Sequence, residues 1–114
     1  MAECIFCQIA KKEIPSSLVY EDEQVFAFED IDPQAPVHVL IITKKHIASV
    51  LEVQDQEEAL MGRLVTAAKK IALQKGIHYR GFRLVLNCNP EGGQAVYHLH
   101  LHLLGGRRMK WPPG

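Results

Sequence analysis

Three histidines alternate with leucines near the C-terminal end of the sequence, as His98, His100 and His102. A period of two residues is typical of a β-strand, so the three imidazoles should lie on one strand face and the leucines on the other. An imidazole is partly neutral at pH 7 and can attack phosphorus or transfer a proton. The alternative is a half-buried strand with an ordinary polar outer face. Three histidines in strict alternation favour a row of imidazoles that does chemistry.

A glycine-rich run, Gly92-Gly93-Gln94, comes just before this predicted strand. Glycines let backbone N–H groups approach an anion closely, and a glutamine amide adds a neutral donor. Such a run is more often a simple turn when it stands alone. Beside the three histidines it predicts a phosphate-binding loop.

Two cysteines near the N-terminus, Cys4 and Cys7, are three residues apart. On a helix this spacing puts both thiols on one face, where they can bind the same ion. Zinc prefers four ligands, and two cysteines with two histidines are a common structural set. The sequence has no second Cys-x-x-Cys, so histidines would have to complete the site. A redox dithiol or a reduced, metal-free pair are the alternatives.

The composition indicates one globular domain over residues 1–114, with 47% hydrophobic residues. Thirteen basic and thirteen acidic residues cancel, so the chain lacks the basic excess expected of a nucleic-acid-binding protein. Its apolar runs are too short to span a membrane, and Met-Ala-Glu-Cys does not resemble a secretion signal. Because an odd number of cysteines argues against a disulfide framework, we expect a cytoplasmic, reducing location.

The periodicity of the apolar residues predicts an α+β fold with a mainly antiparallel sheet. A short helix is expected over Cys4–Lys11. A longer helix should begin at a capping box of Asp55 and Glu58 and end near Gly76. The expected strands are Leu18–Tyr20, Val25–Glu29, Val37–Thr43 (the central one), Phe82–Asn87 and Ala95–Leu104. Asn89–Gly93 should connect the last two strands.

The run His-Leu-His-Leu-His-Leu-Leu, residues 98–104, resembles the signature of the histidine triad (HIT) family of nucleotide hydrolases and transferases. Other segments resemble the Hint branch of that family: Glu13–Pro15, Asp30–Pro36, Lys44–His46, Gly92–Gln94, Val96–His98 and Trp111–Gly114. The resemblance implies a HIT-like fold with a five-stranded antiparallel sheet and two main helices. It also implies a homodimer in which two such sheets join.

The resemblance assigns a role to each histidine of the triad. His100 would be the nucleophile, attacking the α-phosphorus of a nucleotide to form a nucleotidyl-histidine that water then hydrolyses. His102 would bind the phosphate and assist proton transfer. His98 would orient the site, its backbone carbonyl fixing the tautomer of His100. No catalytic metal is expected, although three strand histidines binding one zinc is the competing interpretation. His38 is interpreted as a hydrogen-bonded structural histidine.

The resemblance also implies a nucleotide site. Asp30 would accept the ribose hydroxyls, although such a residue alone is more often part of a loop. The Hint pattern often has Ser where this chain has Ala95, so only the backbone N–H remains there for the phosphate or leaving group. The other expected nucleotide-binding residues are Phe6, Phe28, Ile31, Asn87, Gly93 and Gln94, together with His100 and His102, and Ile5, Ile9 and Ile14 would add walls to the base pocket.

The N-terminal cysteine pair resembles a subset of the family in which the remaining zinc ligands correspond to His46 and His98. The implied substrate is an AMP or GMP conjugate cleaved at a P–N bond. A dinucleoside polyphosphate hydrolase and a nucleotide-binding regulatory protein are the alternatives. Trp111, on a proline-stiffened tail, would dock near the active site of the partner subunit.

Overall fold

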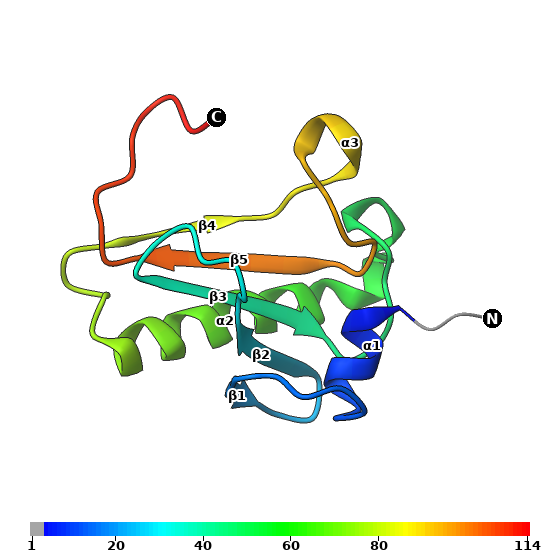
Figure 1. The fold of residues 1–114 in the computed structure, drawn as a ribbon. Helices are drawn as coiled ribbons and strands as arrows, with labels where there is room; N and C mark the ends of the chain where they lie inside the picture. The colour runs from blue at the N-terminus through cyan, green and yellow to red at the C-terminus, as the bar shows by residue number, and fades with distance from the viewer. Residues whose placement is uncertain (1–3) are drawn as a thin grey trace.

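The computed structural model describes residues 4–114, and its centre is a five-stranded sheet in the order β1-β2-β3-β5-β4 (Figure 1). Every neighbouring pair of strands is antiparallel. The strands are β1 (Leu18–Glu21), β2 (Val25–Glu29), β3 (Val37–Thr43), β4 (Phe82–Val85) and β5 (His100–Gly105). The α+β, mainly antiparallel fold and the central place of β3 are therefore confirmed.

Side chains of alternating residues divide the sheet into two covered faces. One face packs against the long helix α2 (Glu58–Lys75), and its core residues include Val39, Ile41, Leu101 and Leu103. The opposite face packs Phe26, Phe28, Leu40 and Ile42 against the short helix α1 (Ile5–Ala10). Because β3 is covered on both faces, it reads as a nearly continuous apolar run.

The helices begin and end close to where the sequence predicts. Cys4 is the N-cap of α1, and Gly76 ends α2 in the left-handed conformation that glycine adopts at low cost. The capping box lies one residue earlier than expected. It consists of Gln54 and Glu57, because the chain enters the helix through two single-turn 3-10 segments, Val50–Glu52 and Asp55–Glu57. Asn89–Gly92 forms one further turn of helix, α3.

The last two strands are shorter than predicted. β4 ends at Val85 rather than Asn87, and β5 begins at His100 rather than Ala95. The last pair in the β3–β5 register joins Ile42 to His100, and β3 ends one residue later. Residues 95–99 therefore have no neighbouring strand with which to continue the ladder, and they form an irregular approach to β5.

Two expectations concern location. In the described part of the chain, no helix has the length and apolar character needed to cross a membrane. Met1–Glu3, on which the expectation about a secretion signal partly depends, lie outside the described residues.

Candidate functional site

The histidine and leucine side chains still point to opposite sides, although β5 begins only at His100. Leu99, Leu101 and Leu103 are buried in the core beneath α2. The rings of His100 and His102 lie on the other face, 4.9 Å apart between centroids. His98 lies in the irregular approach, where the N–H of Leu99 donates to the carbonyl of Ile47 at 2.7 Å.

His100 is oriented by the backbone two residues before it. Its Nδ1 lies 2.8 Å from the carbonyl oxygen of His98. A carbonyl can only accept, so Nδ1 carries the proton and Nε2 of the neutral ring keeps its lone pair. Phe6 packs edge-on against the ring, with centroids 5.2 Å apart. His100 therefore has the tautomer and the fixed orientation that a nucleophile needs.

A second chain of hydrogen bonds sets the tautomer of His102. The backbone N–H of Gln34 donates to Nδ1 of His38 at 3.0 Å, so neutral His38 carries its proton on Nε2. That atom lies 2.9 Å from Nδ1 of His102 and donates to it. The remaining nitrogen of His102, Nε2, consequently carries a proton and can donate a hydrogen bond.

Both of these rings are held neutral at pH 7. Burial lowers the pKa of His102 to about 4, and the neighbouring His100 and His38 add to the effect, while Asp30 opposes it. Burial also lowers the pKa of His38, against the opposing charges of Asp30 and Asp32. His102 is thus a neutral hydrogen-bond donor, well suited to a phosphoryl oxygen.

His38 is the residue of this site that the sequence does not identify. Its interpretation as a hydrogen-bonded structural histidine is incomplete, because its partner is His102. In the β3–β5 register His38 pairs with Leu104, which puts it diagonally beside His102 on the same face. Its place in an otherwise apolar strand is the only available signal, and the register that gives it meaning is a long-range property.

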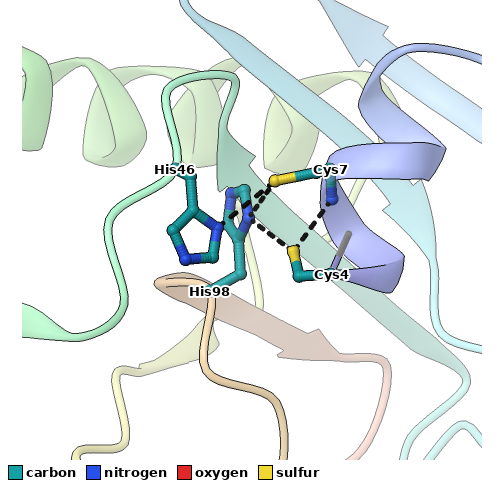
Figure 2. Close-up of side chains that lie close together, drawn as sticks. All are labelled: Cys4, Cys7, His46 and His98. Atoms are coloured by element: carbon teal, nitrogen blue, oxygen red, sulfur yellow. Dashed lines mark hydrogen bonds between the residues drawn. The ribbon is translucent and has the colours of Figure 1, made fainter. Parts of the chain in front are cut away.

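The side chains of Cys4 and Cys7 lie close to those of His46 and His98 (Figure 2). Sγ of Cys4 lies 3.3 Å from Nδ1 of His98, and Sγ of Cys7 lies 3.2 Å from Nδ1 of His46 and 3.5 Å from Nδ1 of His98. The four donor atoms all lie within 4.8 Å of one another. Helix α1, the loop after β3 and the approach to β5 each contribute to the group.

The donor set fits zinc. Nε2 of His98 lies 2.6 Å from the carbonyl oxygen of Thr43, so its proton is on Nε2 and Nδ1 presents a lone pair to the thiols. A metal-bound histidine is commonly oriented by this kind of second hydrogen bond. Burial, the main cause, lowers the pKa of His98, which keeps the ring neutral as a ligand must be. Two cysteines and two histidines are a standard structural zinc set.

A second cluster, Asp30, His38 and His102, also brings three donor atoms within 4.8 Å. It is a poor metal site, because an ion on Nε2 of His38 would force the proton onto Nδ1. The Gln34 N–H already points at that nitrogen, so two protons would face each other. Hydrogen bonding therefore distinguishes the two clusters: the first leaves the His98 Nδ1 lone pair available to a metal, and the second fixes a tautomer.

The family and the relatives that this chain matches are consistent with the histidine site and the cysteine–histidine cluster described above. Residues 11–109 match the model of the HIT domain family. The chain belongs to the HIT domain family. It is 53% identical over 107 residues to the purine nucleoside phosphoramidase of Escherichia coli K12, covering 94% of this chain and 90% of that protein. It is 48% identical over 114 residues to a 14 kDa zinc-binding protein of Brassica juncea, covering 98% of this chain and all of that protein.

A crystal structure of a HIT family hydrolase from Legionella pneumophila matches with a TM-score of 0.96. It is 54% identical, and the match covers 98% of this chain and all of that one. The HIT-like fold and the assignment as a hydrolase are therefore shown for this chain.

The expected base-binding residues of the HIT protein fall into two groups. Phe6 and Phe28 are buried against each other with ring centroids 5.4 Å apart, so they belong to the core under α1. Ile31 is fully exposed. In its burial Asp30 is intermediate between these two groups. Its Oδ2 lies 3.5 Å from Nε2 of His38, and its Oδ1 accepts from the Asp32 N–H at 2.8 Å.

Gln94 does not have the free amide that the sequence led us to expect. Its side chain is buried, and its Nε2 donates to the carbonyls of Ala48 at 2.8 Å and Val96 at 3.1 Å. Its Oε1 accepts from the Asn89 N–H at 3.0 Å. With every donor occupied, this side chain positions three loop segments and has nothing to offer a phosphate.

The glycine loop itself is closed by local hydrogen bonds. The backbone N–H of Gly93 donates to Pro90 and that of Gln94 to Asn89, at 3.0 and 3.1 Å. The side chain of Asn87 lies near Gly93. Within residues 4–114 the Ala95 N–H has no hydrogen-bond partner, so it remains available to an anion.

The C-terminal tail runs beside the edge strand. Nη2 of Arg83, in β4, donates to the carbonyl of Lys110 at 2.8 Å. Trp111 is 82% exposed and belongs to neither hydrophobic core cluster. This exposure agrees with a residue that docks elsewhere.

Proposed function

We propose that this HIT hydrolase cleaves P–N or related bonds at the α-phosphate of purine nucleotide conjugates, through a nucleotidyl-histidine intermediate on His100. The observation that carries the proposal is the 2.8 Å contact between His100 Nδ1 and the His98 carbonyl, because it leaves Nε2 as a lone-pair donor. The name of the E. coli relative, a purine nucleoside phosphoramidase, supports the substrate class.

In the first step Nε2 of His100 forms a bond to the α-phosphorus, and the P–N bond breaks with its electron pair on the leaving nitrogen. That nitrogen takes a proton from water. In the second step water attacks the phosphorus, the electron pair of the P–Nε2 bond returns to His100, and the excess proton of the water goes to solvent. The products are an amine and a nucleoside monophosphate.

His102 stabilises both steps by donating its Nε2–H to a phosphoryl oxygen. A fixed donor aimed at developing negative charge typically contributes about 10²–10³ in rate. The hydrogen-bond chain from Gln34 through His38 keeps that proton on Nε2. It also opposes protonation of Nδ1, so His102 serves as a hydrogen-bond donor and water supplies the protons. The Ala95 N–H is a second candidate donor to the phosphate.

The nucleoside half of the site is part of the same proposal. Asp30 would bind the ribose hydroxyls, with Ile31 and the edge of the Phe6 and Phe28 pair beside the base. Asn87 and Gly93 would lie near the phosphate. Zinc, held by Cys4, Cys7, His46 and His98, would tie α1 to the approach of β5 and take no part in the chemistry. The 14 kDa zinc-binding relative supports this metal.

We further propose that residues 1–114 form a single HIT domain in a cytoplasmic homodimer. The outer edge of β4, with the half-exposed Phe82 in the strand and Leu86 just after it, would pair with its copy, and Trp111 would reach the partner's site. Sedimentation velocity should give twice the chain mass of 12.8 kDa, and a monomer at micromolar concentration would contradict this part.

Mass spectrometry of protein quenched during turnover of an adenosine phosphoramidate tests the function. We expect a nucleotidyl adduct on the peptide that contains His100, and none in His100→Ala. His100→Asn should remain folded and bind AMP without turnover. Retained activity in folded His100→Ala would exclude the mechanism. Faster cleavage of dinucleoside polyphosphates than of phosphoramidates would favour the alternative substrate class, and nucleotide binding without turnover would favour a regulatory protein.

A further inference from the structure

A cavity of about 300 Å³ lies beyond the end of β5 that is farthest from His100. Its walls come from the turn between α2 and β4 and from the segment that follows β5. Three arginines line it: Arg80, Arg107 and Arg108. None of the residues assigned above to catalysis, nucleotide binding or zinc borders this cavity.

The charge of the lining is one-sided. The three arginines are the only ionisable residues among the lining residues. Across residues 4–114, no aspartate or glutamate forms an ion pair with any of them. The whole sequence has a formal net charge of zero, so this is a local excess of positive charge. Three like charges around one cavity repel each other, and a bound anion would relieve that repulsion.

Glycines give the cavity its shape. Gly76, Gly81 and Gly106 have positive φ angles of 74°, 107° and 90°, a region that side chains rarely adopt. A Cβ at Gly76 or Gly81 would meet nothing within 4 Å, so bare backbone borders open space there. A Cβ at Gly106 would come within 2.8 Å of Pro36. The turns therefore depend on glycine and leave room for a ligand.

One of the three guanidinium groups is already held in place. Nε of Arg107 donates to the carbonyl of Gln34 at 3.0 Å, and Nη1 donates to the carbonyl of Arg108 at 3.2 Å. A guanidinium has five N–H donors, so three remain for a ligand. At the C-terminal end of α2, the carbonyls of Ala72 and Leu73 already accept from the backbone N–H groups of Gly76 and Ile77.

We propose that this cavity, called here the arginine pocket, binds a small polyvalent oxyanion of the phosphate class at a place separate from the histidine site. Arginine matches phosphate oxygens with paired N–H donors. The volume is at the lower end of the range for small-molecule sites, which suits inorganic phosphate or pyrophosphate. This inference does not depend on the proposed reaction.

Glycine amides supply a positional test by ¹⁵N–¹H NMR. Sodium phosphate, and separately pyrophosphate, would be titrated into the whole protein against sodium chloride at matched ionic strength. We expect saturable shifts of the Gly76, Gly81 and Gly106 amides, with Gly62 on α2 unchanged. Gly92 and Gly93 report on the histidine site in the same spectra.

Arg80→Gln and Arg108→Gln should each weaken the affinity measured at the pocket glycines by about fivefold or more, the effect of losing about 1 kcal/mol of charged hydrogen bonding. Lys69→Gln, an exposed charge change on α2, should leave it unaltered. All three positions are exposed, so the variants should fold, and the remaining amide shifts check this. Shifts that chloride reproduces, that never saturate, that are confined to Gly92 and Gly93, or that persist unchanged in both arginine variants would overturn the proposal.

Discussion

The carbonyl oxygen of His98 lies 2.8 Å from Nδ1 of His100, so His98 connects the histidine site with the cysteine–histidine cluster. The same His98 directs its Nδ1 at Cys4 and Cys7 and its Nε2 at the carbonyl of Thr43. Its backbone therefore sets the tautomer of His100, the proposed nucleophile, while its side chain belongs to the cluster that would bind zinc. A change in the cysteine–histidine cluster should therefore alter the orientation of His100 through His98.

Removing the side chain of His38 should impair phosphate stabilisation. In His38→Ala, Nδ1 of His102 loses its donor and its tautomer is no longer fixed. We expect kcat/KM to fall by about 10²-fold and the pKa of His102 to rise from about 4 toward the ordinary value.

Ring-resonance NMR gives the pKa of His102 and steady-state kinetics the rate. The matched control is His78→Ala, at an exposed loop histidine, which should change neither. An unaltered His102 pKa in folded His38→Ala would contradict the hydrogen-bond chain.

The lowered pKa of His102 predicts acid sensitivity. The unfolded chain binds a proton near pH 6.5, whereas the folded protein binds it only near pH 4. The unfolded state therefore holds more protons in this window, so the unfolding free energy falls as pH falls from about 6.5 to about 4. The loss from His102 should be about 1–3 kcal/mol, allowing for its partial exposure.

Urea unfolding of wild type, His102→Asn and His78→Asn between pH 7.5 and 4 measures this contribution. The His102→Asn protein should show the shallower decline, and His78→Asn should follow wild type. Parallel curves for all three proteins would rule out a depressed His102 pKa.

The double variant Cys4→Ser with Cys7→Ser should lose zinc and unfold at a lower temperature. Metal that binds only the folded chain adds stability, about 4 kcal/mol when free zinc exceeds its Kd 1,000-fold. Activity should fall only through displacement of His98. Cys88→Ser is the control, since Cys88 lies outside the cluster.

Elemental analysis of purified protein decides whether the metal is present. Less than about one-tenth of a zinc ion per chain, after expression with added zinc, would refute the structural site. In that case a reduced, metal-free cysteine pair becomes the better interpretation.

Gln94→Ala should destabilise the protein more than it weakens nucleotide binding. The substitution leaves the Asn89 N–H and the Ala48 and Val96 carbonyls without their present partner. We expect a loss of about 2–4 kcal/mol in unfolding free energy, with the Kd for AMP changed by less than about threefold where the variant is folded. Gln74→Ala, exposed on α2, should be nearly neutral. A selective loss of AMP affinity at unchanged stability would instead indicate a direct phosphate contact.

The sequence by itself determined which side chains share a face. Alternation at residues 98–103 separates the imidazoles of His100 and His102 from Leu99, Leu101 and Leu103, and this holds in the structure because a two-residue period is a local property of extended chain. The three-residue spacing of Cys4 and Cys7 likewise places both side chains on one face of α1. Apolar periodicity also sufficed for the long helix and the central strand.

Tertiary structure alone decided which of these faces meet and in what register. The pairing of β3 with β5 places His38 beside His102. Because β3 ends at Thr43, β5 cannot begin before His100, and His98 lies outside the ladder, next to the cysteines. Burial turned Gln94 from an expected phosphate donor into a link between three loops. Periodicity carries no information about such contacts, because they join residues 46 to 94 positions apart in the chain, and only the packed fold brings those residues together.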